Sequence, residues 1–309
     1  MRNGKYAAGS GHTLAEAIKA YEGDRLPELR DQATTQVHLD WWRARLGATR
    51  LRELTVMAIA DAIDHLSKEC VKPRKEGNSS RPRKPATLNR YKATLSAVLK
   101  WCQQRGWLTE NPARHVAAKA ENNERTRFLA PEERGRLLAS CKASASAALH
   151  PAVVTLLATG ARLMEIMTLH VGDVDLQGRF LTIRTSKNGD ARRVPLANDA
   201  AVVLSAWLGR DNVTRLPAAL VFPSNVEPGK PADLRRSWRT ALKAANIADF
   251  RRHDLRHSAA SALASGGATL LTIGAVLGHR SAAATKRYAH LAENDLRDAV
   301  DRAAEKQRI

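Results

Sequence analysis

Apolar side chains recur at helical spacing through the first third of the chain. Four segments carry this pattern: residues 14–21 after a capping Thr13, 32–46, 54–66 and 86–108. The second of these segments carries Val37, Leu39, Trp41, Trp42 and Leu46. Gly106 is expected to end the last helix. The pattern predicts an all-helical domain over residues 11–117, preceded by a flexible N-terminus of residues 1–10.

The rest of the chain mixes helical and strand patterns. Residues 118–127 have no apolar stripe and are expected to form a linker to a second domain, residues 128–309. In that domain Pro131 is expected to open a helix, and another helix is expected to run from His150 to His170. These patterns indicate a mainly α fold of the α+β class.

A hairpin and a tail complete the predicted second domain. Strand-type residues between Phe180 and Pro195 flank Asn188-Gly189, which predicts a β-hairpin and so a small antiparallel sheet. Residues 289–309 are expected to form a tail helix. Its apolar stripe consists of Leu296, Ala299, Val300 and Ala303.

Positive charge is in large excess. The 309 residues include 50 Lys and Arg against 31 Asp and Glu, for a formal net charge of +19. Residues 1–127 hold 24 basic and 14 acidic residues, and the remainder holds 26 and 17, so both halves share the excess. A field of this sign attracts polyanions, and it favours nucleic acid over an anionic membrane surface as the partner.

Cations are densest in residues 72–84, KPRKEGNSSRPRK, where Gly and Pro predict an exposed loop. A solvated linker and a surface that contacts DNA phosphates both fit this composition. The candidate DNA-contact residues, in this loop and at the start of the next helix, are Lys72, Arg74, Lys75, Arg81, Arg83, Lys84, Arg90 and Lys92.

Several classes of protein are disfavoured. No apolar run approaches the roughly 18 residues of a membrane span, and residues 1–10 lack the apolar core of a signal peptide, so a cytoplasmic, nucleoid-associated protein is expected. The three cysteines are far apart and predict reduced thiols. His253 and His257 have the spacing of a metal pair, but no carboxylate or cysteine at ligand spacing completes it. Neither a metal nor a cofactor is expected.

Four segments each carry an unusual polar group. Taken singly, each has an ordinary structural explanation, such as an ion pair between Arg162 and Glu165 or a solvated lysine in a turn. His253, Arg256 and His257 share one helical face with little negative charge nearby, which points to an anionic ligand. The groups in chain order are Arg162 after Thr159-Gly160, Lys187 in the hairpin turn, His253 and Arg256 in HDLRH, and His279 and Tyr288 in LGHRSAAATKRY.

The set and its order resemble the tyrosine recombinase (phage integrase) family, from Phe128 to about Arg302. The family's motifs are an arginine box, a hairpin lysine, H-x-L-R, L-G-H and a tyrosine nine residues after the last histidine. This chain matches them with Thr159-Gly160-Ala161-Arg162 and Glu165, Lys187, His253 to Arg256, Leu277 to His279, and Tyr288. Ala161 and Leu163-Met164 depart mildly from the pattern and remove no functional group.

The chemistry of a phosphodiester explains why these residue types are needed. Arg162 and Arg256 can hold its non-bridging oxygens bidentately, which an ammonium cannot do. Tyr288 would be the nucleophile, and its phenol, with an ordinary pKa of about 10, would need a helper such as His253. Lys187 is the candidate general acid for the 5′-oxygen. The resemblance implies the same roles and a catalytic set of Arg162, Lys187, His253, Arg256, His279 and Tyr288.

The remaining polar residues of these motifs receive supporting roles or none. His279 would donate a hydrogen bond to a phosphate oxygen, Glu165 and Asp254 would orient their neighbours, and His257 is assigned no part in the chemistry. The resemblance also implies a 3′-phosphotyrosyl intermediate, which stores the bond energy and makes ATP and metal ions unnecessary.

The resemblance further implies a two-domain clamp on double-stranded DNA. A SAM-like helical core-binding bundle would precede a catalytic domain of the DNA breaking-rejoining fold, with four protomers in the synaptic assembly. Residues 1–10 are too few to form the arm-binding domain that many family members carry. Two alternatives stay open: a type IB topoisomerase and a non-catalytic DNA-binding regulator. The retained tyrosine and arginines favour a recombinase for integration or excision of a phage or mobile element.

Overall fold

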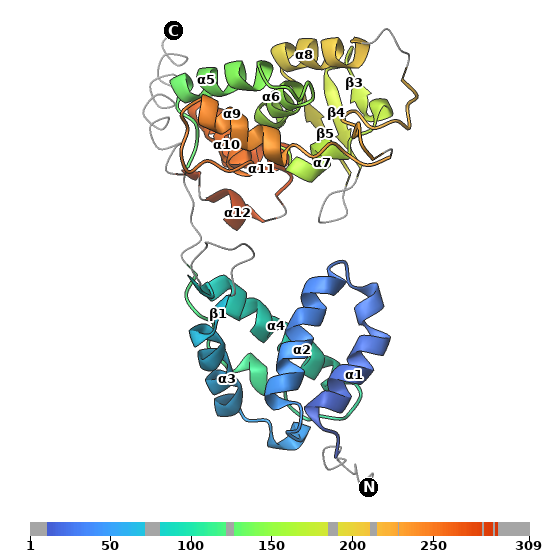
Figure 1. Ribbon diagram of the computed structural model, residues 1–309, viewed down its shortest axis with the longest axis vertical. Coiled ribbons are helices and arrows are strands. Elements are labelled where there is room, and N and C mark those ends of the chain that lie inside the picture. The colour runs from blue at the N-terminus through green and yellow to red at the C-terminus, as the bar shows by residue number, and fades with distance from the viewer. Residues whose placement is uncertain are drawn as a thin grey trace, which may run out of the picture. The chain divides into compact units, whose positions relative to one another are not determined.

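The computed structural model describes residues 11–71, 81–121, 127–184, 191–210, 215–227, 229–279, 281–286 and 288–289. The chain divides into two compact units, Met1–Asn123 and Glu124–Ile309. Both are rich in helices, and the second also contains a three-stranded antiparallel sheet (Figure 1). The expected mainly α, α+β fold is confirmed. Within the described residues, no helix is long and apolar enough to span a membrane.

The described part of the first unit is built from α1 (Leu14–Asp24), α2 (Gln32–Leu46), α3 (Val56–Lys68) and α4 (Pro85–Gln104). The predicted cap of α1 is confirmed, because Thr13 and Glu16 form a reciprocal capping box. Apolar residues of all four helices form one core, in which Trp42 is fully buried. The indole of Trp42 donates a hydrogen bond to the Tyr91 carbonyl at 2.9 Å, so α2 is tied to the middle of α4.

Two details of this unit differ from the sequence expectation. Val37 is 58% exposed, because the buried stripe of α2 runs through His38, Leu39 and Trp42 instead. The ends of the predicted basic loop pair as two short antiparallel strands, β1 (Cys70–Val71) and β2 (Arg81–Pro82). Pro82 is tolerated in β2 because an edge strand does not need a backbone N–H donor at every position, and proline has none. Residues 72–80 lie outside the described part of the chain.

The second unit has a helical part and a three-stranded sheet, which lies at one end of the unit beside α8 (Figure 1). Its strands are β3 (Val174–Asp175), β4 (Phe180–Ile183) and β5 (Arg192–Pro195), all antiparallel in this order. Its helices are α5 (Pro131–Lys142), α6 (Leu149–Thr159), α7 (Leu163–Met167), α8 (Asn198–Gly209), α9 (Arg235–Ala244), α10 (Asp254–Ser265), α11 (Leu270–Leu277) and α12 (Ala282–Lys286).

Pairing of β4 with β5 confirms the predicted hairpin strands. Phe180 pairs with Pro195 and Ile183 with Arg192. The turn that carries Lys187 falls in residues 185–190, outside the described residues. The same holds for residues 290–309, which include nearly all of the predicted tail helix. Pro131 opens α5, as expected.

The expectation of a single helix from His150 to His170 is wrong. The chain forms α6, a break, and then α7. Gly160 ends α6 in the left-handed conformation, with φ of 59°. A Cβ atom there would also lie 2.4 Å from the Cδ2 atom of Leu277, on α11. The break therefore places Arg162 at the start of a new helix.

The described cysteines are free thiols. Burial raises the pKa of Cys102 to about 11 and that of Cys141 to about 12, so both remain protonated at neutral pH. The burial of Cys102 and Cys141 agrees with the structural thiols that the sequence predicts, whereas Cys70 is exposed.

Candidate active site

Arg256 is a buried cation whose position depends on the helix break. It lies in the first turn of α10, is 5% exposed, and donates from Nη1 to the carbonyl oxygen of Gly160 at 2.8 Å. Because α10 packs directly against α6, this bond ties the two helices at the point where α6 ends. Burial first, and the charge of Arg162 second, lower the pKa of Arg256 to about 10. The guanidinium is still charged at neutral pH.

Glu165 connects Arg162 to a second arginine. Its Oε1 accepts from Arg162 Nη1 at 2.8 Å, and its Oε2 accepts from the Arg162 backbone N–H at 2.9 Å. From the other side, Arg192 Nη2 donates to Oε2 at 2.7 Å. Burial raises the pKa of this carboxyl, but the hydrogen bonds from Arg192 and Arg162 outweigh burial and hold it below its ordinary value. The carboxylate is a charged bridge that orients Arg162.

Sequence reasoning missed Arg192. It lies on β5 with a side chain only 13% exposed, and its buried Nε has no hydrogen-bond partner among the described residues. A Cβ atom on Gly278 would lie 2.8 Å from that Nε, so the bare glycine at φ 69° lets the guanidinium approach. The alternation of a strand was the available signal: Arg192 shares its face with the buried Val194, while Arg193 points outward. Arg192 thereby joins β5, α7 and the L-G-H segment.

Tyr288 is buried in the same unit. It is 5% exposed and packs with a small cluster from α10 and α11. Its hydroxyl lies 2.7 Å from Nδ1 of His257. A negative charge on Tyr288 would raise the pKa of Arg256, so the two groups are within electrostatic range of each other. The other buried members of this cluster are Ala260, Ala264, Ile273 and Leu277.

The structure places against Tyr288 a histidine to which the sequence analysis gave no part in the chemistry. His253 was expected to assist Tyr288, and His257 was assigned no chemistry. In the structure the hydrogen bond is made by His257, and the His253 ring packs edge-on against His257 at 5.2 Å between centroids and 89° between planes. His253 lies at the N-cap of α10, one turn before His257.

His279 is tied to the turn that carries Tyr288. It follows Gly278, whose left-handed conformation ends α11. Its Nδ1 lies 2.8 Å from the hydroxyl of Thr285, and the Thr285 carbonyl accepts from the Tyr288 backbone N–H at 2.9 Å. The two predicted residues therefore share one supporting threonine. Of the predicted catalytic set, five residues belong to this described region and Lys187 lies outside it.

The predicted DNA-contact residues divide into three groups. Lys72, Arg74 and Lys75 lie outside the described residues, whereas Arg81, Lys84 and Arg90 are exposed. The other two make contacts within the first unit: Arg83 Nη1 donates to Glu69 Oε2 at 3.0 Å, and Lys92 Nζ donates to the Val116 carbonyl. These bonds indicate that Arg83 and Lys92 support the bundle.

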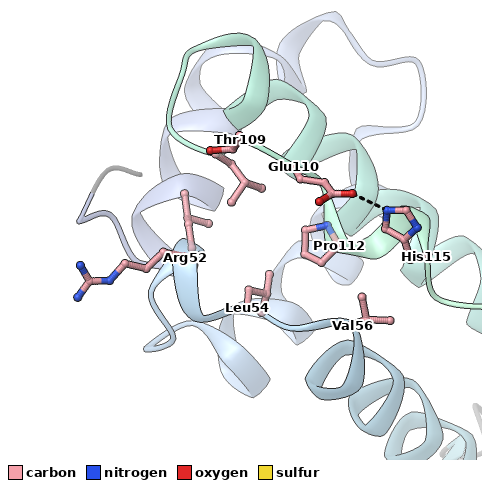
Figure 2. Close-up of a pocket in the computed structure, with 9 residues that line it drawn as sticks. Arg52, Leu54, Val56, Thr109, Glu110, Pro112 and His115 are labelled. Carbon is pink, nitrogen blue, oxygen red and sulfur yellow. Dashed lines mark hydrogen bonds and ion pairs between the residues drawn. The ribbon is translucent and has the colours of Figure 1, made fainter. Parts of the chain in front are cut away.

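A hollow in the first unit, shown in Figure 2, offers no comparable set of groups. Its labelled lining mixes apolar Leu54, Val56 and Pro112 with scattered polar side chains, and the ion pair between Glu110 and His115, at 2.8 Å, is exposed. Among the described residues of the whole chain, His, Cys, Asp and Glu side chains nowhere gather in threes as a metal site requires. The groups suited to phosphate chemistry are those of the second unit.

Comparison with known proteins bears on this site. Residues 127–295 match the model of the phage integrase family. The chain is 29% identical over 286 residues to the integrase of Salmonella phage P22, covering 84% of this chain and 71% of that protein. It is 31% identical over 231 residues to the tyrosine recombinase XerC of Mycobacterium leprae, covering 70% and 76%.

The fold agrees with a solved structure. The integrase of transposon Tn1549, in complex with circular intermediate DNA, superposes with a TM-score of 0.71 at 17% identity, covering 94% of this chain and 99% of that one. The resemblance seen in the motifs is thus confirmed by the family model, by sequence relatives and by the fold. The chain belongs to the phage integrase family and is a tyrosine recombinase, an enzyme of site-specific DNA recombination.

Proposed function

We propose that Tyr288 is the nucleophile of DNA strand cleavage and that Arg162 and Arg256 bind the scissile phosphate of double-stranded DNA. The observation that carries this proposal is the burial of the Tyr288 hydroxyl within range of the charge of Arg256, in one unit. No residue from a second protein chain is needed to bring these groups together.

The two arginines suit an anion whose charge grows during the reaction. In cleavage, negative charge accumulates on the non-bridging oxygens of the phosphate, and preorganised cations lower the barrier most effectively there. Each guanidinium has one identified internal partner, Glu165 for Arg162 and the Gly160 carbonyl for Arg256. Those bonds hold the guanidinium planes, and the further N–H groups of each fork suit phosphate oxygens.

Bond changes in the proposed reaction balance without a cofactor. The Tyr288 hydroxyl gives its proton to an adjacent histidine and its oxygen forms a bond to phosphorus, while the bond from phosphorus to the 5′-oxygen breaks. Lys187 gives a proton to that leaving oxygen, and His279 donates a hydrogen bond to the phosphate. A 5′-hydroxyl of another strand then attacks the 3′-phosphotyrosyl linkage and releases Tyr288. The energy of the original phosphodiester is kept in the linkage, so neither ATP nor a metal is required.

The direct test is covalent capture on a DNA substrate nicked close to the cleavage site. The wild-type protein is expected to remain attached to the DNA, because the short 5′ fragment diffuses away. Tyr288→Phe keeps the buried ring and lacks the reactive oxygen, so it should bind DNA with nearly unchanged affinity and give no covalent product. Capture by Tyr288→Phe at the wild-type level would remove Tyr288 from the nucleophile role.

The same assay separates the alternatives. A non-catalytic regulator gives no capture with the wild-type protein, and a topoisomerase cleaves without exchanging strands between two duplexes. Strand exchange is expected here, for integration or excision of a phage or mobile element. The names of the relatives, a phage integrase and a transposon integrase among them, support this choice.

Recombination of two duplexes also requires several protomers. We propose four protomers on two duplexes, formed only on DNA, with the apolar stripe of residues 289–309 contributing to the contacts between them. Deleting the residues after Glu293 should then weaken assembly, measured by sedimentation with DNA, while binding to a single site is retained. Normal assembly and recombination by the shortened protein would exclude this role for the tail.

A further inference from the structure

His257 is the buried titratable residue that the predicted catalytic set omits. Its Nδ1 lies 2.7 Å from the Tyr288 hydroxyl, and the two side chains are 8% and 5% exposed. We propose that His257 is a catalytic residue of the cleavage step, and that its Nδ1 accepts the proton of Tyr288 as the phenol oxygen attacks phosphorus. This inference rests on the proposed function in one respect, that Tyr288 is the nucleophile.

Helical geometry explains why His257 and Arg256, which are adjacent in the sequence, face different partners. Successive side chains of a helix point about 100° apart. Arg256 faces the end of α6, where it binds the Gly160 carbonyl, and the next residue faces the tyrosine. Helix α10 packs against both α6 and α11, so each direction is filled by a different partner. The phosphate-binding arginine and the acceptor for the nucleophile are thus consecutive residues.

The contact is held from both sides. Behind His257, the ring of His253 packs edge-on at 5.2 Å and limits the tilt of the imidazole. On the other side, the backbone N–H of Tyr288 donates to the Thr285 carbonyl at 2.9 Å, and Thr285 itself is bound by His279. A buried phenol without a hydrogen-bond partner is unfavourable, so the His257 contact also stabilises the buried position of the hydroxyl.

The proton transfer follows from the chemistry of the two groups. When the imidazole carries its proton on Nε2, the lone pair of Nδ1 accepts the phenol O–H. A neutral imidazole is a weaker base than a phenolate, so the proton moves as the bond from oxygen to phosphorus forms and not before. The 5′-oxygen takes its proton from Lys187. In rejoining, the departing Tyr288 oxygen recovers its proton from His257.

A purely structural role for the hydrogen bond between His257 and Tyr288 would have the opposite effect on the rate of DNA cleavage. If the hydrogen bond merely stored Tyr288 in an unreactive position, breaking it would leave cleavage unchanged or faster. If His257 accepts the proton, removing it slows cleavage. His257→Asn is the decisive variant, because an Asn oxygen can occupy the place of Nδ1 and accept the hydrogen bond but cannot take up the proton at neutral pH. His257→Ala removes both functions.

The experiment measures single-turnover covalent capture on two nicked substrates. One has the ordinary phosphodiester and the other has sulfur in place of the 5′-bridging oxygen, which leaves without needing a proton. His257→Asn is expected to cleave on the order of 10²–10⁴-fold more slowly than wild type on both substrates, the usual contribution of a general base. Lys187→Ala should be slow on the first and restored on the second. DNA affinity and the unfolding midpoint of His257→Asn should match wild type.

Three results would overturn the inference: cleavage by His257→Asn at or above the wild-type rate, restoration of this variant by the sulfur substrate, or equal rates for His257→Ala and wild type. The first result would mean that the His257 contact only stores Tyr288 in an unreactive position. The second would mean that His257 acts on the leaving 5′-oxygen. Failure of the proposed function would give a different result, because Tyr288→Phe would then still form the covalent product with DNA. An inactive Tyr288→Phe with a fully active His257→Asn contradicts only the role of His257.

Discussion

Arg192 on β5 donates to Glu165 on α7 at 2.7 Å, and the same carboxylate accepts from Arg162 at 2.8 Å. A residue of the hairpin therefore positions a residue of the proposed phosphate site through one buried carboxylate. Arg192 also lies against Gly278, directly before His279. Because displacement of a reacting group by about 1 Å can cost roughly 10²-fold in rate, this support should matter for catalysis.

Arg192→Gln and Glu165→Gln are each expected to slow single-turnover cleavage by about 10²-fold with little change in DNA affinity. The matched control is Arg193→Gln, which changes the adjacent residue on the opposite face of β5, 61% exposed. Rates of covalent capture and affinities from gel shift would be compared. Equal losses for Arg192→Gln and Arg193→Gln would show that the hairpin as a whole, and not the carboxylate bridge, is responsible.

Arg162→Lys and Arg256→Lys should each reduce cleavage on the order of 10²–10³-fold, although the charge is kept. A lysine ammonium cannot hold its internal partner and grip a phosphate oxygen in the same plane. Arg235→Lys is the control, since that exposed arginine pairs with Asp233 at 2.7 Å, outside the site. Capture at close to the wild-type rate by either site variant would remove that arginine from the phosphate site.

Gly160→Ala should destabilise the second unit by about 1–3 kcal/mol. The new methyl group would force a left-handed backbone on alanine and overlap Leu277 Cδ2 at 2.4 Å. Gly135→Ala provides a control of opposite sign, because Gly135 is exposed within α5 and its added Cβ would meet nothing within 4 Å. That variant should gain roughly 0.5–1 kcal/mol. Urea unfolding followed by circular dichroism measures both changes.

DNA affinity should fall steeply with salt, since about six to ten phosphate contacts correspond to a loss on the order of 10³–10⁵ between roughly 50 and 200 mM salt. Arg81→Ala, Lys84→Ala and Arg90→Ala should each lower the salt slope by about one unit, because each variant removes a cation that would neutralise one phosphate. Lys92→Ala should instead lower the stability of the first unit, because its Nζ donates to the Val116 carbonyl. An unchanged slope in the combined triple variant would exclude this surface from DNA binding.

Acid should weaken a specific ion pair at the start of α5. Hydrogen bonds from Arg127, at 2.5 and 2.8 Å, lower the pKa of Glu133 from 4.5 to about 2. A carboxyl with a depressed pKa stabilises the folded state above the ordinary value and loses that contribution as pH falls toward 2. The difference in unfolding free energy between wild type and Glu133→Gln should therefore be constant above about pH 5 and shrink below it. A difference independent of pH would contradict the ion pair.

Local patterns in the sequence determined much of this protein. Thr13 with Glu16, and Pro131 before an apolar stripe, specify helix starts through contacts within one turn, which a linear chain displays directly. Alternating residues around Asn188-Gly189 specified the paired strands. The spacing of reactive residue types was enough to identify the family, because the chemistry of a phosphodiester demands those types whatever surrounds them.

Tertiary packing decided which residues from distant segments of the sequence contact one another. Gly160 breaks the expected helix where Leu277 crowds it, Arg192 reaches Glu165 across 27 positions, and His257 meets Tyr288 across 31. None of these contacts follows from the spacing of residues along a helix or strand. The contact of His257 depends on how α10 packs against α6 and α11, and that of Arg192 depends on how β5 lies beside α7. A rotation of α10 by a single residue would have turned Arg256 or Ser258 toward the tyrosine in place of His257.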